Sequence, residues 1–90
     1  MMTNKIRKIY EHYGEAQLDI AQEELAELIQ AISKYRRNKG KVERFHCEEE
    51  IADVEIMLQQ VIWIIGTDRK TIDEWKEYKI ERQLGRIEEE

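Results

Sequence analysis

The sequence contains no proline, one cysteine and only four glycines among its 90 residues. The lone Cys47 excludes a disulfide framework within the chain, and it also excludes a zinc site built from several cysteines of one chain. The absence of proline, together with the many Glu, Lys, Leu and Ile residues, favours long helices. A single thiol and the lack of a signal-like apolar N-terminus fit a reducing compartment, so we expect a cytoplasmic protein.

Long hydrophobic runs and a basic charge excess are also missing. The longest apolar run, residues 61–65, falls far short of the roughly 18 residues of a membrane span. The net charge of -5 argues against a general nucleic-acid binder. We therefore expect neither a membrane nor a nucleic acid as partner. A chain of this length predicts one domain, residues 1–90, whose small core makes oligomerisation a usual remedy.

The apolar residues recur at helical spacing in four segments, at about residues 4–13, 15–37, 42–65 and from 71 onward. The turn-forming segment 38–41 is short, so the two long helices should lie antiparallel as an αα-hairpin. Thr71 and Glu74 are spaced as a capping box that would start the last helix. The predicted fold is an all-α, small helical bundle built on this long hairpin and completed by oligomerisation. The stripes expected to be buried are Leu18, Ala21, Leu25, Leu28 and Ile32 on one long helix, and Ile51, Val54, Leu58, Val61 and Ile65 on the other.

Two pairs of acidic residues run directly beside these apolar stripes. Glu24 and Glu27 are three residues apart on the first long helix, and Glu50 and Asp53 are three apart on the second. Residues with this spacing share a helix face, so each pair can aim two carboxylates at one point. Four carboxylates brought together across a hairpin repel one another unless a cation lies between them. Mg²⁺ suits such oxygen ligands and keeps waters for a phosphate substrate, so the pattern fits one or more Mg²⁺ ions and a polyphosphate.

The segments 23–28 (EELAEL) and 49–54 (EEIADV) resemble the E-x-x-E and E-x-x-D blocks of the MazG-like all-α nucleoside triphosphate pyrophosphohydrolases. Lys76, Lys79 and Arg82 fall where that family tends to carry a basic K-x-x-K…R pattern, so the likeness extends over residues 17–82. One departure is Ile80, where many relatives place an asparagine. This difference bears on substrate preference more than on the reaction.

The resemblance implies cleavage of a nucleoside triphosphate between its α and β phosphates, giving the monophosphate and pyrophosphate. It implies a requirement for Mg²⁺, with Mn²⁺ often substituting, and a homodimer or homotetramer with sites near subunit interfaces. Many relatives act in nucleotide-pool house-cleaning. Carried over residue by residue, the metal ligands would be Glu24, Glu27, Glu50 and Asp53, and the phosphate contacts would be Lys76, Lys79 and Arg82.

Two finer roles are hypotheses about single residues. A carboxylate that is not fully committed to metal can take a proton from the attacking water, and we assign that catalytic role to Glu27. Gln17 lies one or two helical turns before Glu24 and is a candidate for hydrogen bonding to the nucleotide base.

Other interpretations stay open at this point. The acidic pairs of so charged a chain can be surface charge on a non-catalytic helical interaction module. Glu43 and His46 form a Glu-x-x-His motif of the kind used by di-iron carboxylate bundles, although a second such motif would have to come from another subunit. A basic stretch from Lys34 to Arg44 spans the turn and is typical of a solvated helix end, with a phosphate contact as the alternative.

Overall fold

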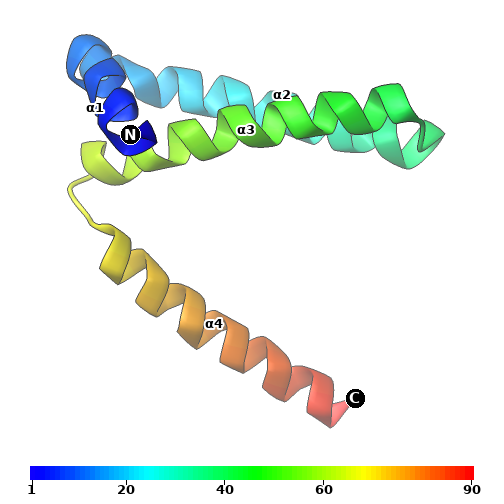
Figure 1. The fold of residues 1–90 in the computed structure, drawn as a ribbon. Helices are drawn as coiled ribbons and strands as arrows, with labels where there is room; N and C mark the ends of the chain where they lie inside the picture. The colour runs from blue at the N-terminus through cyan, green and yellow to red at the C-terminus, as the bar shows by residue number, and fades with distance from the viewer.

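The computed structural model describes residues 1–90 and consists of helices with no strand, which confirms the predicted all-α class. One short 3₁₀ helix separates the first two of the four α-helices (Figure 1). The elements in chain order are α1 (Met2–Tyr13), η1 (Gly14–Ala16), α2 (Gln17–Asn38), α3 (Lys41–Ile64) and α4 (Arg69–Glu89). The four helical segments expected from the apolar spacing are all present, with ends that differ by a few residues.

Helices α2 and α3 lie side by side and antiparallel, as the short connection predicts (Figure 1). Lys39 ends α2 in the left-handed conformation, with φ at 51°, and its N–H donates to the Tyr35 carbonyl at 2.7 Å. Gly40 is extended and precedes α3; a Cβ on this residue would overlap the Glu43 carboxylate. Two residues therefore suffice to reverse the chain, and a side chain at the second of them would require the Glu43 carboxylate to move.

The interior of the hairpin is narrow and partly polar. The buried residues of the two helices are Gln17, Ala21 and Ala31 on α2, and Val54, Met57, Gln60 and Ile62 on α3. The alanines are small, so the two backbones can approach closely. At the α1 end of the hairpin, Gln17 Nε2 donates to Gln60 Oε1 at 3.0 Å, which satisfies a buried amide pair and fixes the register of the two helices.

The apolar stripes predicted to be buried are only partly so. Ala21 and Val54 are buried, but Leu25, Ile32, Ile51 and Leu58 each expose more than 40% of their surface. The helices are rotated so that the row through Ala21, Glu24 and Ala31 faces α3, and the larger apolar side chains point outward. Glu24 and Glu50 are therefore half-buried between the helices, while Glu27 and Asp53 stay exposed at the border of the core, as the sequence pattern predicts.

Helix α1 packs against the end of α3 through aromatic contacts. The rings of Tyr10 and Trp63 are 5.6 Å apart, and the Arg7 guanidinium lies 4.3 Å from the centre of the Trp63 ring. Gly14, with φ at 64°, ends α1 and lets the chain turn into η1 and α2. Trp63 is thus half-buried and held by two side chains of α1.

The N-cap of helix α4 lies three residues earlier than the sequence predicts, so the proposed capping box at Thr71 is wrong. The N-cap is Asp68, whose carboxylate accepts from the Thr71 backbone N–H at 2.7 Å. Aspartate is among the strongest N-cap residues. Its carboxylate satisfies the Thr71 backbone N–H, which has no partner within the first turn of the helix. The hydrogen bonds from Thr71 hold the pKa of Asp68 below its usual value.

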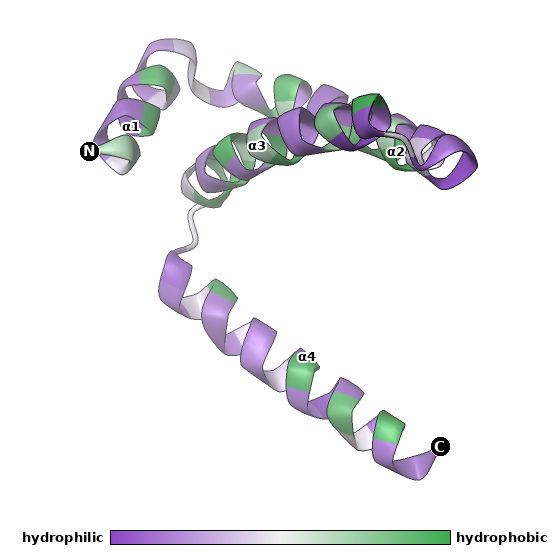
Figure 2. Ribbon diagram, turned by 45° about the vertical axis from the view of Figure 1, so that its right-hand side comes forward, coloured by the Kyte–Doolittle hydropathy of each residue, from purple (hydrophilic) through white to green (hydrophobic).

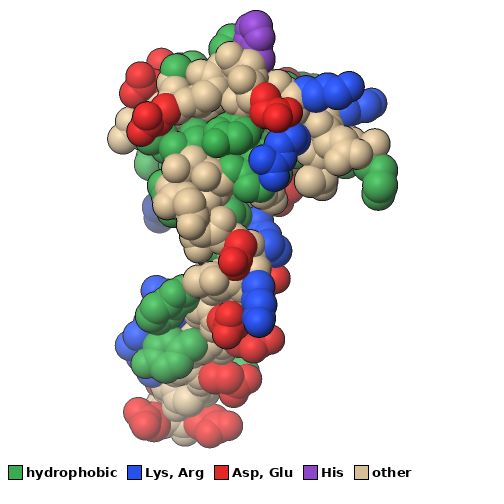
Figure 3. All heavy atoms as spheres, turned by 90° about the vertical axis from the view of Figure 1, so that its left-hand side faces the viewer, with side chains coloured by type: hydrophobic (Ala, Val, Ile, Leu, Met, Phe, Trp, Pro, Cys, Tyr) green, Lys and Arg blue, Asp and Glu red, His purple; other side chains and the backbone are tan.

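Helix α4 extends away from the hairpin and buries none of its residues (Figures 1 and 2). The radius of gyration is 16.1 Å, whereas a compact chain of this length has roughly 12 Å. The exposed area is 7529 Å², and a folded monomer of 10.9 kDa exposes only about 5,600 Å². Apolar side chains reach the surface both at the hairpin end and along α4 (Figure 3). None of the helices is apolar over enough of its length to span a bilayer.

Candidate functional site

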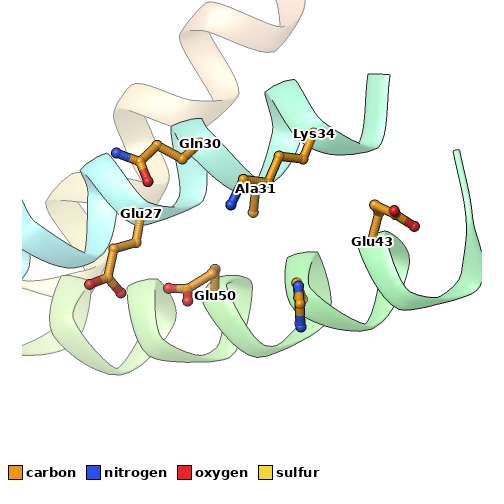
Figure 4. Close-up of a pocket in the computed structure, with 7 residues that line it drawn as sticks. Glu27, Gln30, Ala31, Lys34, Glu43 and Glu50 are labelled. Carbon is orange, nitrogen blue, oxygen red and sulfur yellow. The ribbon is translucent and has the colours of Figure 1, made fainter. Parts of the chain in front are cut away.

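Three carboxylates converge between the two long helices. Glu24 and Glu27 come from α2 and Glu50 comes from α3, and one carboxylate oxygen of each lies within 4.8 Å of the others. Figure 4 shows Glu27 and Glu50 reaching toward one another across the space between the helices. The i,i+3 spacing on α2 and the short turn that sets the hairpin register together bring these side chains to one point. We call Glu24, Glu27 and Glu50 the acidic cluster.

The environment of the acidic cluster disfavours its negative charge. Desolvation raises the pKa of Glu24 to about 7, with further contributions from the charges of Glu27, Asp53 and Glu50. Desolvation also raises the pKa of Glu50, together with the charges of Glu27 and Asp53. The helices thus bring carboxylates together at a cost that only protons or a cation can offset.

Two oxygens of the cluster have no partner. Glu24 Oε2 and Glu50 Oε2 are both shielded from solvent, and neither accepts a hydrogen bond. A buried acceptor without a donor is rare in folded proteins, and a bound ion, a water or a catalytic role accounts for such a group. Oxygen ligands from carboxylates are those that Mg²⁺ and Mn²⁺ prefer, so the residues present fit a hard divalent cation.

Asp53, the fourth predicted ligand, lies beside the cluster without being part of it. Its side chain is exposed on α3, one helical turn from Glu50. It is near enough that its charge raises the pKa of both Glu24 and Glu50. The structure therefore brings three of the four predicted ligands together and holds the fourth at their border.

The predicted phosphate contacts lie elsewhere in this chain. Lys76, Lys79 and Arg82 are on α4, which extends away from the hairpin (Figure 1). Lys76 lies 3.9 Å from Asp73, and the Arg82 guanidinium lies 5.6 Å from the centre of the Tyr78 ring. Both cations therefore have partners on their own helix, and neither approaches the acidic cluster of the same chain.

Two further residues singled out from the sequence have definite places. Gln17 is buried, and its amide is used by Gln60, so the structure gives it a packing role; the base contact stays a prediction. His46 is exposed and is not part of the acidic cluster, although it lies one helical turn before Glu50. A di-iron site of the Glu-x-x-His kind would need His46 among the ligands, so this arrangement does not favour it.

A cleft of about 340 Å³ opens beside the acidic cluster, toward the Lys39–Gly40 turn. Its lining, drawn in Figure 4, consists of Glu27, Gln30, Ala31, Lys34, Glu43, His46 and Glu50. The sequence favours a solvated helix end here, with a phosphate contact by the basic stretch from Lys34 to Arg44 as the alternative. The available signal was spacing, because Glu27, Gln30 and Lys34 share one face of α2, and Glu43, His46 and Glu50 share one face of α3.

Comparisons of this chain with protein-family models, with curated proteins and with solved structures found no match. The geometry of the acidic cluster and its cleft therefore carries the functional argument, together with the sequence motifs.

Proposed function

We propose that this chain is a Mg²⁺-dependent nucleoside triphosphate pyrophosphohydrolase of the MazG-like type. It adds water across the α–β phosphoanhydride, so that a nucleoside monophosphate and pyrophosphate leave. The observation that carries the proposal is the convergence of three carboxylates from two helices, two of whose oxygens are buried without a partner.

Each acidic residue has a stated part in this proposal. Glu24, Glu27, Glu50 and Asp53 would hold Mg²⁺, with Mn²⁺ as a substitute. The bound ion would act as a Lewis acid and neutralise charge on the phosphates. Glu27 is the exposed member of the acidic cluster and also lines the cleft, so its carboxylate can accept the proton that the attacking water loses.

The phosphate contacts of the proposal require more than one chain. Phosphoryl transfer depends mainly on positioning and on charge stabilisation, which Lys76, Lys79 and Arg82 can supply. These residues do not approach the acidic cluster of their own chain, so we propose that α4 of one copy serves the hairpin of another. The chain exposes about 1,900 Å² more than a folded monomer of its mass. That excess is larger than the roughly 800 Å² per partner of a standard interface, which supports a homodimer or homotetramer.

One observation favours a second candidate. Helix α4 is unpartnered and exposes Trp75, Tyr78 and Leu84, as a helix that binds another protein would. A non-catalytic helical interaction module is therefore the alternative, and it gives the acidic cluster no role.

Pyrophosphate release from a panel of standard and modified nucleoside triphosphates separates the two candidates. We expect release in Mg²⁺, none in EDTA, and loss on Glu50→Gln. Glu49→Gln is the matched control, because Glu49 is an exposed neighbour outside the acidic cluster and should retain activity. A preference for modified nucleotides would support a house-cleaning role. Silence across the panel, or equal activity of the two variants, would overturn the proposal in favour of the interaction module.

A further inference from the structure

The cleft between the acidic cluster and the turn of the hairpin has its own charge pattern. Lys34 is the only lysine or arginine in its lining, and His46 lies on the opposite wall. The Lys34 side chain runs back along α2 toward Glu27, in the direction in which helical side chains tilt (Figure 4). No carboxylate lies within 4 Å of its ammonium, so Lys34 forms no ion pair within the chain.

The one acidic residue at the far end of the cleft, Glu43, is held at the turn. Glu43 accepts a hydrogen bond from Asn38 Nδ2 at 3.2 Å and lies against Gly40. Its carboxylate points toward the turn and away from Glu50 (Figure 4). Passing from the cluster toward the turn, a ligand would therefore meet carboxylates first, then the amine of Lys34 and the imidazole of His46. The Glu43 carboxylate comes last and is engaged by Asn38.

We propose that this cleft holds the pyrophosphate portion of the substrate, with Lys34 and His46 as its protein contacts. This inference rests on the proposed function and extends it, because it assigns contacts within the same chain in addition to those expected from α4. The order of charges along the cleft carries the argument. A phosphate chain whose reacting end lies at a cation held by the acidic cluster extends toward the turn. Its outer oxygens then meet an unpaired ammonium.

The length of the cleft agrees with this assignment. Lys34 is seven residues after Glu27 on α2, and His46 is four residues before Glu50 on α3. At 1.5 Å per residue, these separations are about 10 Å and 6 Å along the helix axes. The Lys34 side chain shortens the first distance by reaching back, so both groups can contact one phosphate chain. Without a divalent cation the acidic lining would repel pyrophosphate, so pyrophosphate should bind only when the cation is also bound.

The test measures inhibition by the two products separately. Lys34→Gln should raise the inhibition constant of inorganic pyrophosphate in Mg²⁺ by roughly 10- to 100-fold, the effect of losing a hydrogen bond to a charged group. The inhibition constant of the nucleoside monophosphate should change by less than about twofold, because that product leaves from the other side of the bond. Lys34→Arg should retain most of the pyrophosphate affinity, and His46→Gln should lose less of it than Lys34→Gln.

Lys41→Gln is the matched control, since it removes one lysine near the same turn from outside the cleft. Lys34 is exposed and forms no ion pair, so the folded state should tolerate its replacement; unchanged thermal unfolding checks this. Equal constants for Lys34→Gln and Lys41→Gln would overturn the inference and leave the proposed function intact. Weakened monophosphate inhibition in place of pyrophosphate inhibition would also overturn it. If the unaltered protein releases no pyrophosphate from any triphosphate, the proposed function fails, and that result is obtained before any variant is measured.

Discussion

The α2–α3 hairpin and α4 are helical regions of opposite character. The hairpin has an interior, and the acidic cluster lies at its border with two shielded, unpartnered oxygens. Helix α4 buries no residue and carries the predicted phosphate-binding cations on an exposed surface. The carboxylates that would hold a metal and the α4 cations that would contact the phosphates are thus separated within one chain. The proposed second copy, with its α4 at this hairpin, would account both for this separation and for the excess exposed area.

The largest effect should come from the hairpin. Glu27→Gln keeps the shape of the side chain and removes its basicity, so we expect kcat to fall by about 10²- to 10⁴-fold, as for loss of a general base. The Mg²⁺ concentration for half-maximal activity should rise by a smaller factor than kcat falls, because Glu24, Glu50 and Asp53 remain as ligands. Steady-state kinetics with a Mg²⁺ series measures both quantities. Glu23→Gln, on the exposed face of the same helix, is the control; an equal loss there would break the assignment.

The comparison between the regions predicts complementation between subunits. Glu50→Gln and Arg82→Ala should each be nearly inactive alone. If α4 acts on the hairpin of another copy, mixed dimers contain one intact site of two, and an exchanged equimolar mixture should recover about one quarter of the normal activity. The two proteins would be co-refolded and assayed after light scattering has established the oligomeric state. Activity no greater than the sum of the separate variants would show that each α4 serves its own chain.

The position of α4 is also where the sequence is least informative. The apolar spacing and the Asn38–Lys41 turn predict the hairpin, and the E-x-x-E and E-x-x-D spacing predicts which carboxylates face one another. Spacing alone does not show how α2 is rotated toward α3. Ala21 belongs to the apolar stripe with Leu25 and Ile32, but it also lies three residues before Glu24, on the face that the structure turns toward α3. The small alanines allow close approach of the two helices, and this leaves Glu24 and Glu50 half-buried between them.

Other features of the site depend on contacts between residues distant in sequence. The Gln17–Gln60 hydrogen bond joins residues 43 positions apart, so Gln17 alone suggested a ligand contact. The role of Asp68 as a cap was missed because Thr71 and Glu74 form a familiar pattern three residues later. The cleft at Lys34 requires the rotation of both long helices, which no local motif specifies.

The acidic cluster should make stability depend on pH in opposite directions with and without metal. The pKa of Glu24 is raised from its ordinary 4.5 to about 7, so the folded chain keeps a proton that the unfolded chain releases between these values. In EDTA the free energy of unfolding should therefore fall as pH rises through this window. Mg²⁺ must displace that proton, so its affinity should increase over the same window.

Thermal unfolding from pH 5 to pH 8, with and without Mg²⁺, measures this effect. At a Mg²⁺ concentration 100 times its Kd, stabilisation should reach about 2.7 kcal/mol near pH 8 and be smaller near pH 5. Glu24→Gln should flatten the metal-free profile relative to the unaltered protein. A metal-free stability that rises between pH 5 and pH 7 by the same amount in both proteins would contradict the assignment.

The smallest effect should come from the α1 end of the hairpin, where Gln17 and Gln60 are hydrogen-bonded. Gln60→Leu leaves the buried Gln17 amide without its partner and should lower the free energy of unfolding by about 1–3 kcal/mol. The double variant Gln17→Leu, Gln60→Leu should recover much of that loss, because neither amide is then left unpaired. Urea unfolding compares these proteins with Gln22→Leu, an exposed position on α2. Strict additivity of the two single changes would show that the amide pair does not couple the helices.

The most direct test of the account is a titration with Mn²⁺ followed by electron paramagnetic resonance, because it examines metal binding without requiring a substrate. The account predicts saturable binding to the unaltered protein and to Glu49→Gln, competition by Mg²⁺, and a loss of binding on Glu50→Gln. Equal binding to both variants, or no saturable binding to any of the proteins, would contradict the claim that the acidic cluster is a metal site.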